Sequence, residues 1–338
     1  MKKILITGGF GFLGTHLTEH LVMEKDNLVH VVDDLSNNPV NIDYFINEIE
    51  DPKNLSFNIM KVKEYFSSPD LPVFDEIYHL SSPVGPAGVL KHAGNIVRQV
   101  VNDCYLIIDY CLAKEAKMLL VSTSEIYGGG QEGYCSENTT KIVPSKTTVR
   151  LEYAIGKLAA ETAIINTCSD KDLKAVIIRP FNIAGPRQSP KGGFVLPRFI
   201  QQAHQGYPLT VFGDGSAIRA FTHVKDMVEG IVLAMHRGRN GEAYNVGNPS
   251  NKTNIQQLAE KTVGIVGSKS EIQFVDPKTI YGDYYEEAND KFPDSEKAKK
   301  ELQWLPRLGI ENVIQDSYAE FLKRVEAGVV GKEHSVVN

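Results

Sequence analysis

Cysteine is scarce in this chain, positive charge is not in excess, and long apolar runs are missing. The four cysteines (Cys104, Cys111, Cys135 and Cys168) have neither the spacing of a metal site nor that of a disulfide framework. The formal net charge of -6 argues against binding to a nucleic-acid backbone. No run reaches the roughly 18 consecutive apolar residues of a membrane helix. We therefore expect a cytoplasmic protein that holds no metal and binds neither nucleic acid nor membrane.

The apolar residues, 42% of the chain, occur in short runs that alternate with helical stretches. The opening MKKILITGG breaks off at Thr7, too early for a signal peptide, and is expected to form a first strand over 3–7. Further strands are expected over 28–32, 76–80, 118–122 and 175–178, and helices over 15–25, 95–116 and 150–167. Apolar strands separated by helices predict an α/β fold, a Rossmann-type doubly wound parallel sheet with helices on both faces.

A glycine-rich loop, GGFGFLG, follows the first predicted strand and precedes the first predicted helix. Gly8, Gly11 and Gly14 allow a tight turn and the close approach of a pyrophosphate to a helix N-terminus. Asp33 ends the second strand 19 residues beyond Gly14. Its carboxylate can accept both ribose hydroxyls of NAD and would repel the extra phosphate of NADP. The sequence predicts an NAD site, with Asp34 as the rival ribose ligand and a solvated loop acid as the structural alternative.

Tyr153 and Lys157 lie four residues apart on a predicted helix, so their side chains share one face. A phenol is a poor base at neutral pH, but a neighbouring ammonium and a nicotinamide cation would favour the phenolate. Tyr153 would then take a proton from an alcohol while a hydride leaves the same carbon. When such a pair is isolated, packing plus a solvated amine is the commoner explanation.

Thr123 and Glu125, in the stretch VSTSEIYG, favour the catalytic interpretation. Thr123 follows a predicted parallel strand, at the sheet edge where such folds bind ligands, and its hydroxyl would hold the reacting oxygen. Glu125 would point to the same side and supply a second acid or base, unless it is an exposed loop residue.

After Pro180 the sequence changes character, with Gly, Pro and polar residues in FNIAGPRQSPKGGF. We expect the NAD-binding Rossmann domain to cover 1–180 and to regain about 220–248, where FTHVKDMVEGIVLAMHRG and AYNVG have the pattern of a core helix and a strand. A smaller mixed α/β substrate-binding lobe is expected over about 181–219 and 249–327, followed by a tail over 328–338.

In this order the motifs resemble the extended short-chain dehydrogenase/reductases, specifically the NAD-dependent nucleotide-sugar epimerase/dehydratase family. The likeness covers residues from about 3 to 322. Besides the glycine loop and the Tyr153/Lys157 pair, it rests on DEIYHLSS, VSTSEIYG, RPFNIAGPRQ, FGDGSAIRAFTHVKDM, YNVGN and FPDSEKAKKELQW.

The resemblance implies a nucleotide diphosphate sugar as substrate, a UDP-sugar first, and a role for each motif residue. Cofactor contacts would come from Gly8, Gly11, Phe12, Leu13, Gly14, Asp33, Leu80, Ser81, Tyr153 and Lys157, and the catalytic set would be Thr123, Ser124, Glu125, Tyr153 and Lys157. The substrate-binding residues would be Asn182 at the diphosphate, Leu196, Pro197 and Phe199 at the base, and Arg219 and Lys291 at phosphate. Lys291 stands where relatives have an arginine, so it offers a point charge instead of a fork. Lys61 stands where relatives often have an acid, which leaves the adenine contact unassigned.

Relatives first oxidise C4 of the sugar to a ketone, after which decarboxylation, 4,6-dehydration and 4-epimerisation diverge. Dehydratases usually carry Asp-Glu after the threonine, where this chain has Ser124 and Glu125, and simple 4-epimerases usually lack the glutamate. The triplet that starts at Thr123 is most similar to UDP-glucuronate decarboxylases, as is SSP at 81–83, whereas VGPAGVLKHAG and EYAIGK depart from them. Decarboxylation of UDP-glucuronate is the first expectation, dehydration the second and epimerisation the third. A non-catalytic NAD-binding sensor or scaffold is a remote alternative, because such proteins commonly lose the tyrosine or lysine.

Family members are often dimers joined by two helices of each subunit, which here would be 95–116 and 150–167. The apolar cluster Tyr105, Leu106, Ile107, Ile108 and Tyr110 is compatible with such a homodimer and equally with core packing.

Overall fold

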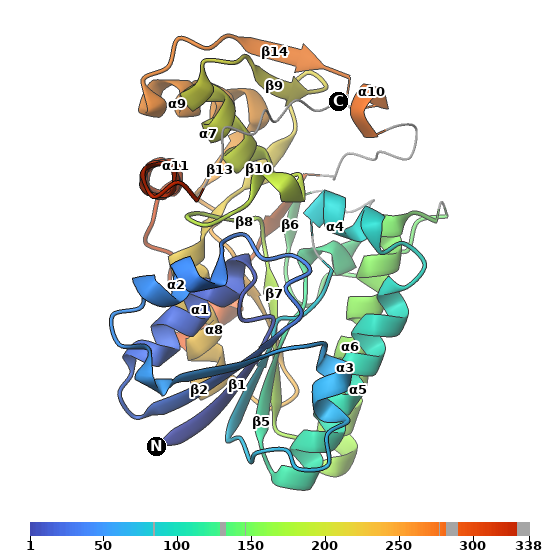
Figure 1. Cartoon of the computed structure of the whole chain (residues 1–338). Coiled ribbons are helices and arrows are strands. Elements are labelled where there is room, and N and C mark those ends of the chain that lie inside the picture. The colour runs from blue at the N-terminus through green and yellow to red at the C-terminus, as the bar shows by residue number, and fades with distance from the viewer. Residues whose placement is uncertain (84, 129–132, 146, 277, 282–289, 330–338) are drawn as a thin grey trace.

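The computed structural model describes residues 1–329 apart from 84, 129–132, 146, 277 and 282–289, and it has two lobes (Figure 1). Among the described residues, seven parallel strands form the sheet of the larger lobe. In spatial order they are β12 (Ala243–Val246), β7 (Ala175–Pro180), β5 (Lys117–Val121), β4 (Glu76–His79), β1 (Lys2–Thr7), β2 (Asn27–Asp33) and β3 (Leu55–Ile59). The strand order reverses at β1, so the carboxyl ends of β1 and β4 border the crevice where such sheets bind ligands.

Helices cover both faces of this sheet (Figure 1). One face carries α1 (Phe12–Met23), α2 (Ile42–Glu48) and α8 (Val224–Arg237), and the other carries α3 (Val62–Phe66), α5 (Ile96–Lys114) and α6 (Val149–Lys171). Each face has its own hydrophobic core, and β1 contributes to both. Ile4 and Ile6 belong to the first core and Leu5 to the second. Burial on both faces explains why this strand is a continuous apolar run.

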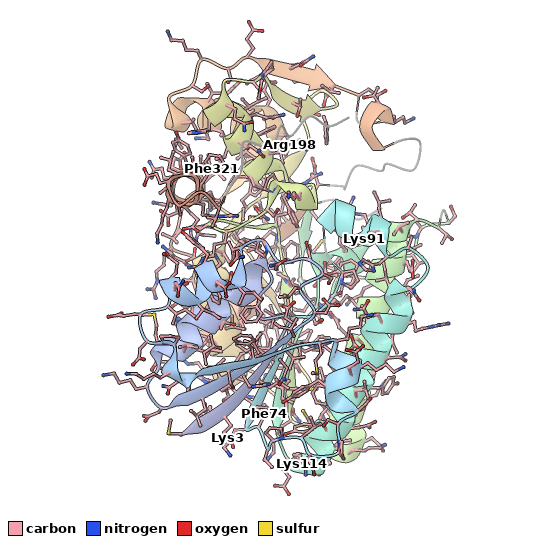
Figure 2. All side chains as sticks on the ribbon, in the orientation of Figure 1. Lys3, Phe74, Lys91, Lys114, Arg198 and Phe321 are labelled. Atoms are coloured by element: carbon pink, nitrogen blue, oxygen red, sulfur yellow. The ribbon has the colours of Figure 1, made fainter. Side chains whose placement is uncertain are left out.

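The small lobe is formed by α7 (Val195–Gln205), α9 (Ile255–Val266) and α11 (Ile310–Glu326), which pack around a third core. Two strand pairs complete it. Strand β9 (Leu209–Phe212) runs parallel to β14 (Ile272–Val275), and β10 (Ile218–Ala220) runs antiparallel to β13 (Lys252–Asn254). In Figure 2, the labelled side chains of Arg198 and Phe321 lie in this lobe, whereas Phe74 and Lys114 lie at the opposite end of the molecule.

Two short parallel pairs join distant parts of the chain. Strand β6 (Gly133–Cys135) pairs with β15 (Lys291–Pro293), and β8 (Ile183–Ala184) pairs with β11 (Thr222–His223). The remaining elements are α4 (Gly85–Lys91), α10 (Lys278–Tyr281) and single turns at Pro52–Asn54, Ser124–Tyr127, Pro190–Gly192 and Ala298–Leu302.

The predicted fold class is confirmed, and each predicted strand and helix has a counterpart within a few residues. After its first excursion into the small lobe the chain returns to the main sheet, where β12 pairs with β7. Of the expected tail, 330–338 lies outside the described residues. In the part of the chain that the structure describes, every helix is too short or too polar to cross a bilayer.

Candidate active site

The glycine loop joins β1 to α1 at the carboxyl edge of the sheet. Gly11 is the N-cap residue of α1, so the first N–H groups of the helix, from Phe12 and Leu13 onward, face the loop. Space is tight, because a Cβ on Gly14 would lie 2.0 Å from the Gly8 carbonyl oxygen and a Cβ on Gly8 would lie 2.8 Å from the Ser81 nitrogen. The glycines leave the loop backbone open to close approach, so the loop forms a cradle that fits the pyrophosphate of a dinucleotide such as NAD.

Asp33 ends β2 beside this cradle. Its Oδ2 accepts a hydrogen bond from the Phe10 N–H (2.9 Å), and its Oδ1 accepts one from the Leu35 N–H (2.8 Å). Burial raises the pKa of Asp33, and these two hydrogen bonds act in the opposite direction. Asp34 is exposed and accepts from the Ser36 N–H instead. Since a carboxylate oxygen can accept more than one hydrogen bond, Asp33 keeps capacity for the ribose hydroxyls of NAD.

Tyr153 and Lys157 on α6 face the carboxyl ends of β4 and β5. Lys157 is 1% exposed, and its Nζ donates to the Val121 carbonyl across 2.9 Å. Thr123 and Ser82 lie beside the Tyr153 hydroxyl, where each acts to lower its pKa. The structure thus brings three of the predicted catalytic side chains together, on the side of the sheet where the glycine cradle lies.

Burial is the main cause of the shifted pKa values of Tyr153 and Lys157. It raises the pKa of Tyr153 above its ordinary range, although the hydrogen bonds with Thr123 and Ser82 act in the opposite direction. It also lowers the pKa of Lys157 to about 8. The protein's own groups therefore do not produce the predicted phenolate, because burial of the phenol, with a smaller contribution from the charge of Glu125, keeps the proton on its oxygen. The phenolate needs the second cation that the prediction included, the nicotinamide ring.

Glu125 lies next to this group and is surrounded by positive charge. Its backbone N–H donates to Thr123 Oγ1 (3.1 Å). Its Oε2 lies 3.1 Å from Arg150 Nε and 3.6 Å from Lys291 Nζ. Burial opposes ionisation of this carboxyl, but the charges of Arg150, Lys291 and Arg219 outweigh it and hold the pKa below its usual value. Glu125 is therefore a carboxylate at neutral pH, suited to act as a base or an anionic anchor and not as a proton donor.

The two predicted phosphate ligands both have protein anions as neighbours. Lys291 is 7% exposed, pairs with Glu125 and approaches the Ser124 carbonyl at 3.5 Å. Arg219 Nη1 lies 3.0 Å from Asp290 Oδ1. Lys291 thus belongs to the surroundings of Glu125, which places it nearer the catalytic group than the sequence alone indicated.

The other predicted substrate residues lie on the small-lobe side. Asn182 has a φ of +36°, and its Nδ2 donates to the Ala220 carbonyl at 3.5 Å. Pro197 is buried in the first turns of α7, and Leu196 and Phe199 belong to the small-lobe core at 1% and 0% exposure. These side chains are therefore not exposed to the base of a nucleotide, the contact that the sequence predicted, unless α7 rearranges.

Sequence reasoning missed two neighbours of the catalytic group. Arg150 lies three residues before Tyr153 on α6, so helical periodicity could have placed both on one face. Ser82, which lies beside the Tyr153 hydroxyl, follows Leu80 and Ser81 just after the end of β4. Its position at a strand end was the available signal.

The glycine cradle, the carboxylate of Asp33 beside it and the Tyr153/Lys157 pair together define a Rossmann-type dinucleotide-dependent oxidoreductase. The chain belongs to the NAD dependent epimerase/dehydratase family, whose model matches residues 4–247. The predicted family, its enzyme class and its NAD cofactor are thereby confirmed.

Two known decarboxylases are similar to the chain over most of its length. The UDP-N-acetyl-alpha-D-glucosaminuronate decarboxylase of Bacillus cytotoxicus is 31% identical over 327 residues, which cover 95% of this chain and 98% of that protein. UDP-glucuronic acid decarboxylase 1 of Xenopus tropicalis is 31% identical over 325 residues, 96% of this chain and 73% of that protein. The solved UDP-glucuronic acid 4-epimerase of Bacillus cereus, in complex with UDP-glucuronic acid and NAD, matches with a TM-score of 0.80 and 25% identity, covering 95% of this chain and 99% of that one.

Proposed function

We propose that the protein is an NAD-dependent decarboxylase of a nucleotide diphosphate uronate, with UDP-glucuronate as the first candidate. The observation that carries this proposal is the charge around Glu125, whose single carboxylate lies between Arg150 and Lys291 beside Tyr153. Arg150 and Lys291 place two positive charges next to the reacting centre. Positive charge there suits a sugar that carries its own carboxylate. The two decarboxylases described above support the same substrate class.

The first half of the reaction oxidises the sugar at C4. NAD, which the glycine loop and Asp33 would hold, would supply the hydride acceptor for this oxidation and the hydride donor for the closing reduction. Thr123 and Tyr153 hydrogen-bond to the C4 oxygen, and Tyr153 takes its proton as the carbonyl forms. Lys157, held by the Val121 carbonyl, keeps a buried positive charge beside the tyrosine.

Oxidation at C4 converts the uronate into a β-keto acid. The C5–C6 bond then breaks, CO2 leaves, and the bonding electron pair moves into the C4 carbonyl to give an enolate. Thr123 and Tyr153 stabilise the developing oxyanion by the hydrogen bonds that held the alcohol. Uptake of a proton at C5 restores the ketone, and its reduction gives a nucleotide pentose.

The alternatives differ in what they ask of residues 124 and 125. A 4,6-dehydratase needs a proton donor for the departing C6 hydroxyl, and this chain has Ser124 there with an ionised Glu125. Epimerisation, the third expectation from the sequence, needs only rotation of the keto sugar, and the structural similarity to a uronate 4-epimerase raises it to the second candidate.

Incubation of the protein with NAD and a panel of UDP-, dTDP-, GDP- and CDP-sugars, followed by product mass, tests the proposal. We expect UDP-glucuronate, or its N-acetylated analogue, to lose CO2. Loss of water from a neutral hexose, or unchanged mass with altered stereochemistry, would replace decarboxylation by dehydration or epimerisation.

Substitutions separate the charge argument from the chemistry. Arg150→Gln is expected to raise KM for UDP-glucuronate about tenfold or more, since it removes a charge-assisted contact. Arg307→Gln, which breaks the exposed pair with Glu229, is the matched control and should leave KM unchanged. Tyr153→Phe should retain NAD and lose conversion, whereas retained conversion would contradict its role.

We also propose that the protein forms a homodimer through α5 and α6. Of the predicted apolar cluster, Ile107, Ile108 and Tyr110 are buried within the protomer, whereas Tyr105 is 49% exposed. Ile155, at 39% exposure, borders the same groove as Tyr105. Ile155→Arg should give monomers in sedimentation, and Phe274→Arg, on the exposed strand β14, should not. A monomeric wild type would end this proposal.

We also propose that the chain divides into two domains. We propose residues 1–180 and about 220–248 as the NAD-binding domain and the rest up to about 327 as the nucleotide-sugar lobe. The four cysteines are free thiols in the structure. This supports the reducing environment of a cytoplasmic enzyme.

A further inference from the structure

The segment that leads from β8 into the small lobe lies against α1, the helix of the NAD cradle. Pro186 offers its carbonyl to the ring of His16, whose Nε2 lies 2.8 Å away. His16 is on the second turn of α1 and is 8% exposed. Burial lowers the pKa of His16 to about 3, so the ring is neutral and its Nε2–H can donate to this carbonyl.

Arg187 makes the next contacts from the same segment. Its Nη1 donates to Glu19 Oε2 on α1 across 2.7 Å, and its guanidinium carbon lies 5.3 Å from the ring centroid of Phe45 on α2. The Arg187 side chain is 10% exposed. Its backbone φ of +65° is a conformation that costs a non-glycine residue free energy, so the contacts on both sides hold it there.

Phe45 links Arg187 to the glycine loop of the proposed cofactor site. Its ring packs edge-on against Phe10 with centroids 6.0 Å apart, and Phe10 lies in the glycine loop. The backbone N–H of Phe10 is the donor that Asp33 Oδ2 accepts. Arg187 is thus two side chains away from the proposed ribose acid, although it belongs to a different part of the chain.

A second contact reaches the same region from α11. Arg324 Nη2 donates to the Pro39 carbonyl across 2.8 Å, and Lys323 pairs with Glu48 at the end of α2. Pro39 and Glu48 both belong to the segment that runs from Asp33 to the end of α2. Two elements of the small lobe therefore contact α1, α2 and the segment that follows the proposed ribose ligand Asp33.

We propose that Arg187 is a positioning residue for NAD, because it fixes Phe45 and α1 so that the glycine loop and Asp33 keep the shape that binds the dinucleotide. The small lobe then contributes to cofactor retention without touching the cofactor. The inference concerns NAD alone and needs no sugar, so it can fail or succeed independently of the decarboxylase proposal.

Exchange of bound NAD for radiolabelled NAD, measured on the holoenzyme, tests this. Arg187→Met should exchange about tenfold faster than wild type, in the range of coupling free energies between sites. Arg187→Lys keeps the charge toward Glu19 but cannot lie flat on Phe45, and it should fall between the two. Arg307→Met removes an exposed ion pair of 2.9 Å elsewhere and is the matched control.

An exchange rate of Arg187→Met equal to that of wild type overturns the proposal. So does an acceleration that the control shares, because it would reflect general loosening. If Arg187→Met yields no folded protein, Arg187→Lys decides, and a wild-type rate in that variant also overturns the proposal.

Discussion

The ammonium of Lys157 donates to the carbonyl of Val121, the last residue of β5. This bond fixes a buried cation at the end of the strand that Thr123 follows, one helical turn from Tyr153 on α6. An ammonium has three donors, so it can hold the strand and a ribose hydroxyl of the cofactor at once.

Replacing this cation should stop the reaction. For Lys157→Met we expect kcat to fall by about a hundredfold or more, the usual scale for loss of a group that supports proton transfer. Lys157→Arg should not restore it, because a planar fork cannot occupy the ammonium's site. Steady-state kinetics with the substrate found in the sugar panel measures both. A decrease of only a few fold would remove Lys157 from the catalytic group.

The buried pair Glu161–Arg179 should be costly to break. Arg179 Nη2 lies 2.6 Å from Glu161 Oε2, and both side chains are at most 5% exposed. Glu161→Gln leaves the guanidinium without its counter-charge and should lower the free energy of unfolding by about 3–5 kcal/mol. The double variant Glu161→Leu/Arg179→Met should lose less than the single one, since neither charge then remains buried. Urea unfolding compares them, and a single variant as stable as wild type would contradict the argument.

Two glycine substitutions should change different properties, one NAD binding and the other stability. Gly14→Ala would put a Cβ 2.0 Å from the Gly8 carbonyl oxygen and should abolish NAD binding. Gly264 lies exposed within α9, where a Cβ would meet no described atom within 4 Å. Gly264→Ala should therefore raise the free energy of unfolding by about 0.5–1 kcal/mol, as helix propensity predicts. Calorimetric titration with NAD and thermal unfolding are the measurements, and NAD binding by Gly14→Ala would refute the cradle.

His79 should make the protein sensitive to mild acid. Burial, with a smaller contribution from Lys157, lowers the pKa of His79 from 6.5 to about 3. Between these values the unfolded chain binds a proton that the folded protein excludes. The free energy of unfolding therefore falls as pH drops below about 6.5. His79→Gln cannot titrate, so its stability should fall less steeply from pH 7 to 5. Parallel slopes for wild type and variant would exclude this contribution.

Periodicity and turn chemistry were enough to predict the fold class and the cradle. The run from Lys3 to Thr7 became β1, and the helix after Gly11 began at Phe12, three residues earlier than its apolar spacing indicated. Strand β3 was not predicted. Its exposed Phe57 and Ile59 lie at the sheet edge, and their sequence lacks the continuous apolar run of an interior strand.

The candidate site likewise has a part that the sequence could predict and a part that it could not. Tyr153, Lys157 and Thr123 were found because each occupies a position that local geometry defines, on a helix face or after a strand. The pairing of Glu125 with Lys291 could not be predicted, because the parallel contact of β6 with β15 brings them together. The roles assigned to these residues stay predictions until the variants are measured.

The return of the chain to the main sheet has a consequence for synthesis. The backbone N–H groups of Ile177 and Phe181, along the outer edge of β7, bond to the carbonyls of Glu242 and Val246. A nascent polypeptide that has emerged only as far as β7 presents that edge unpaired, and unpaired edges invite association with other chains. Any premature stop before β12 is therefore expected to yield a fragment that aggregates. Translation must pass through part of the small lobe before the sheet of the larger lobe can be completed.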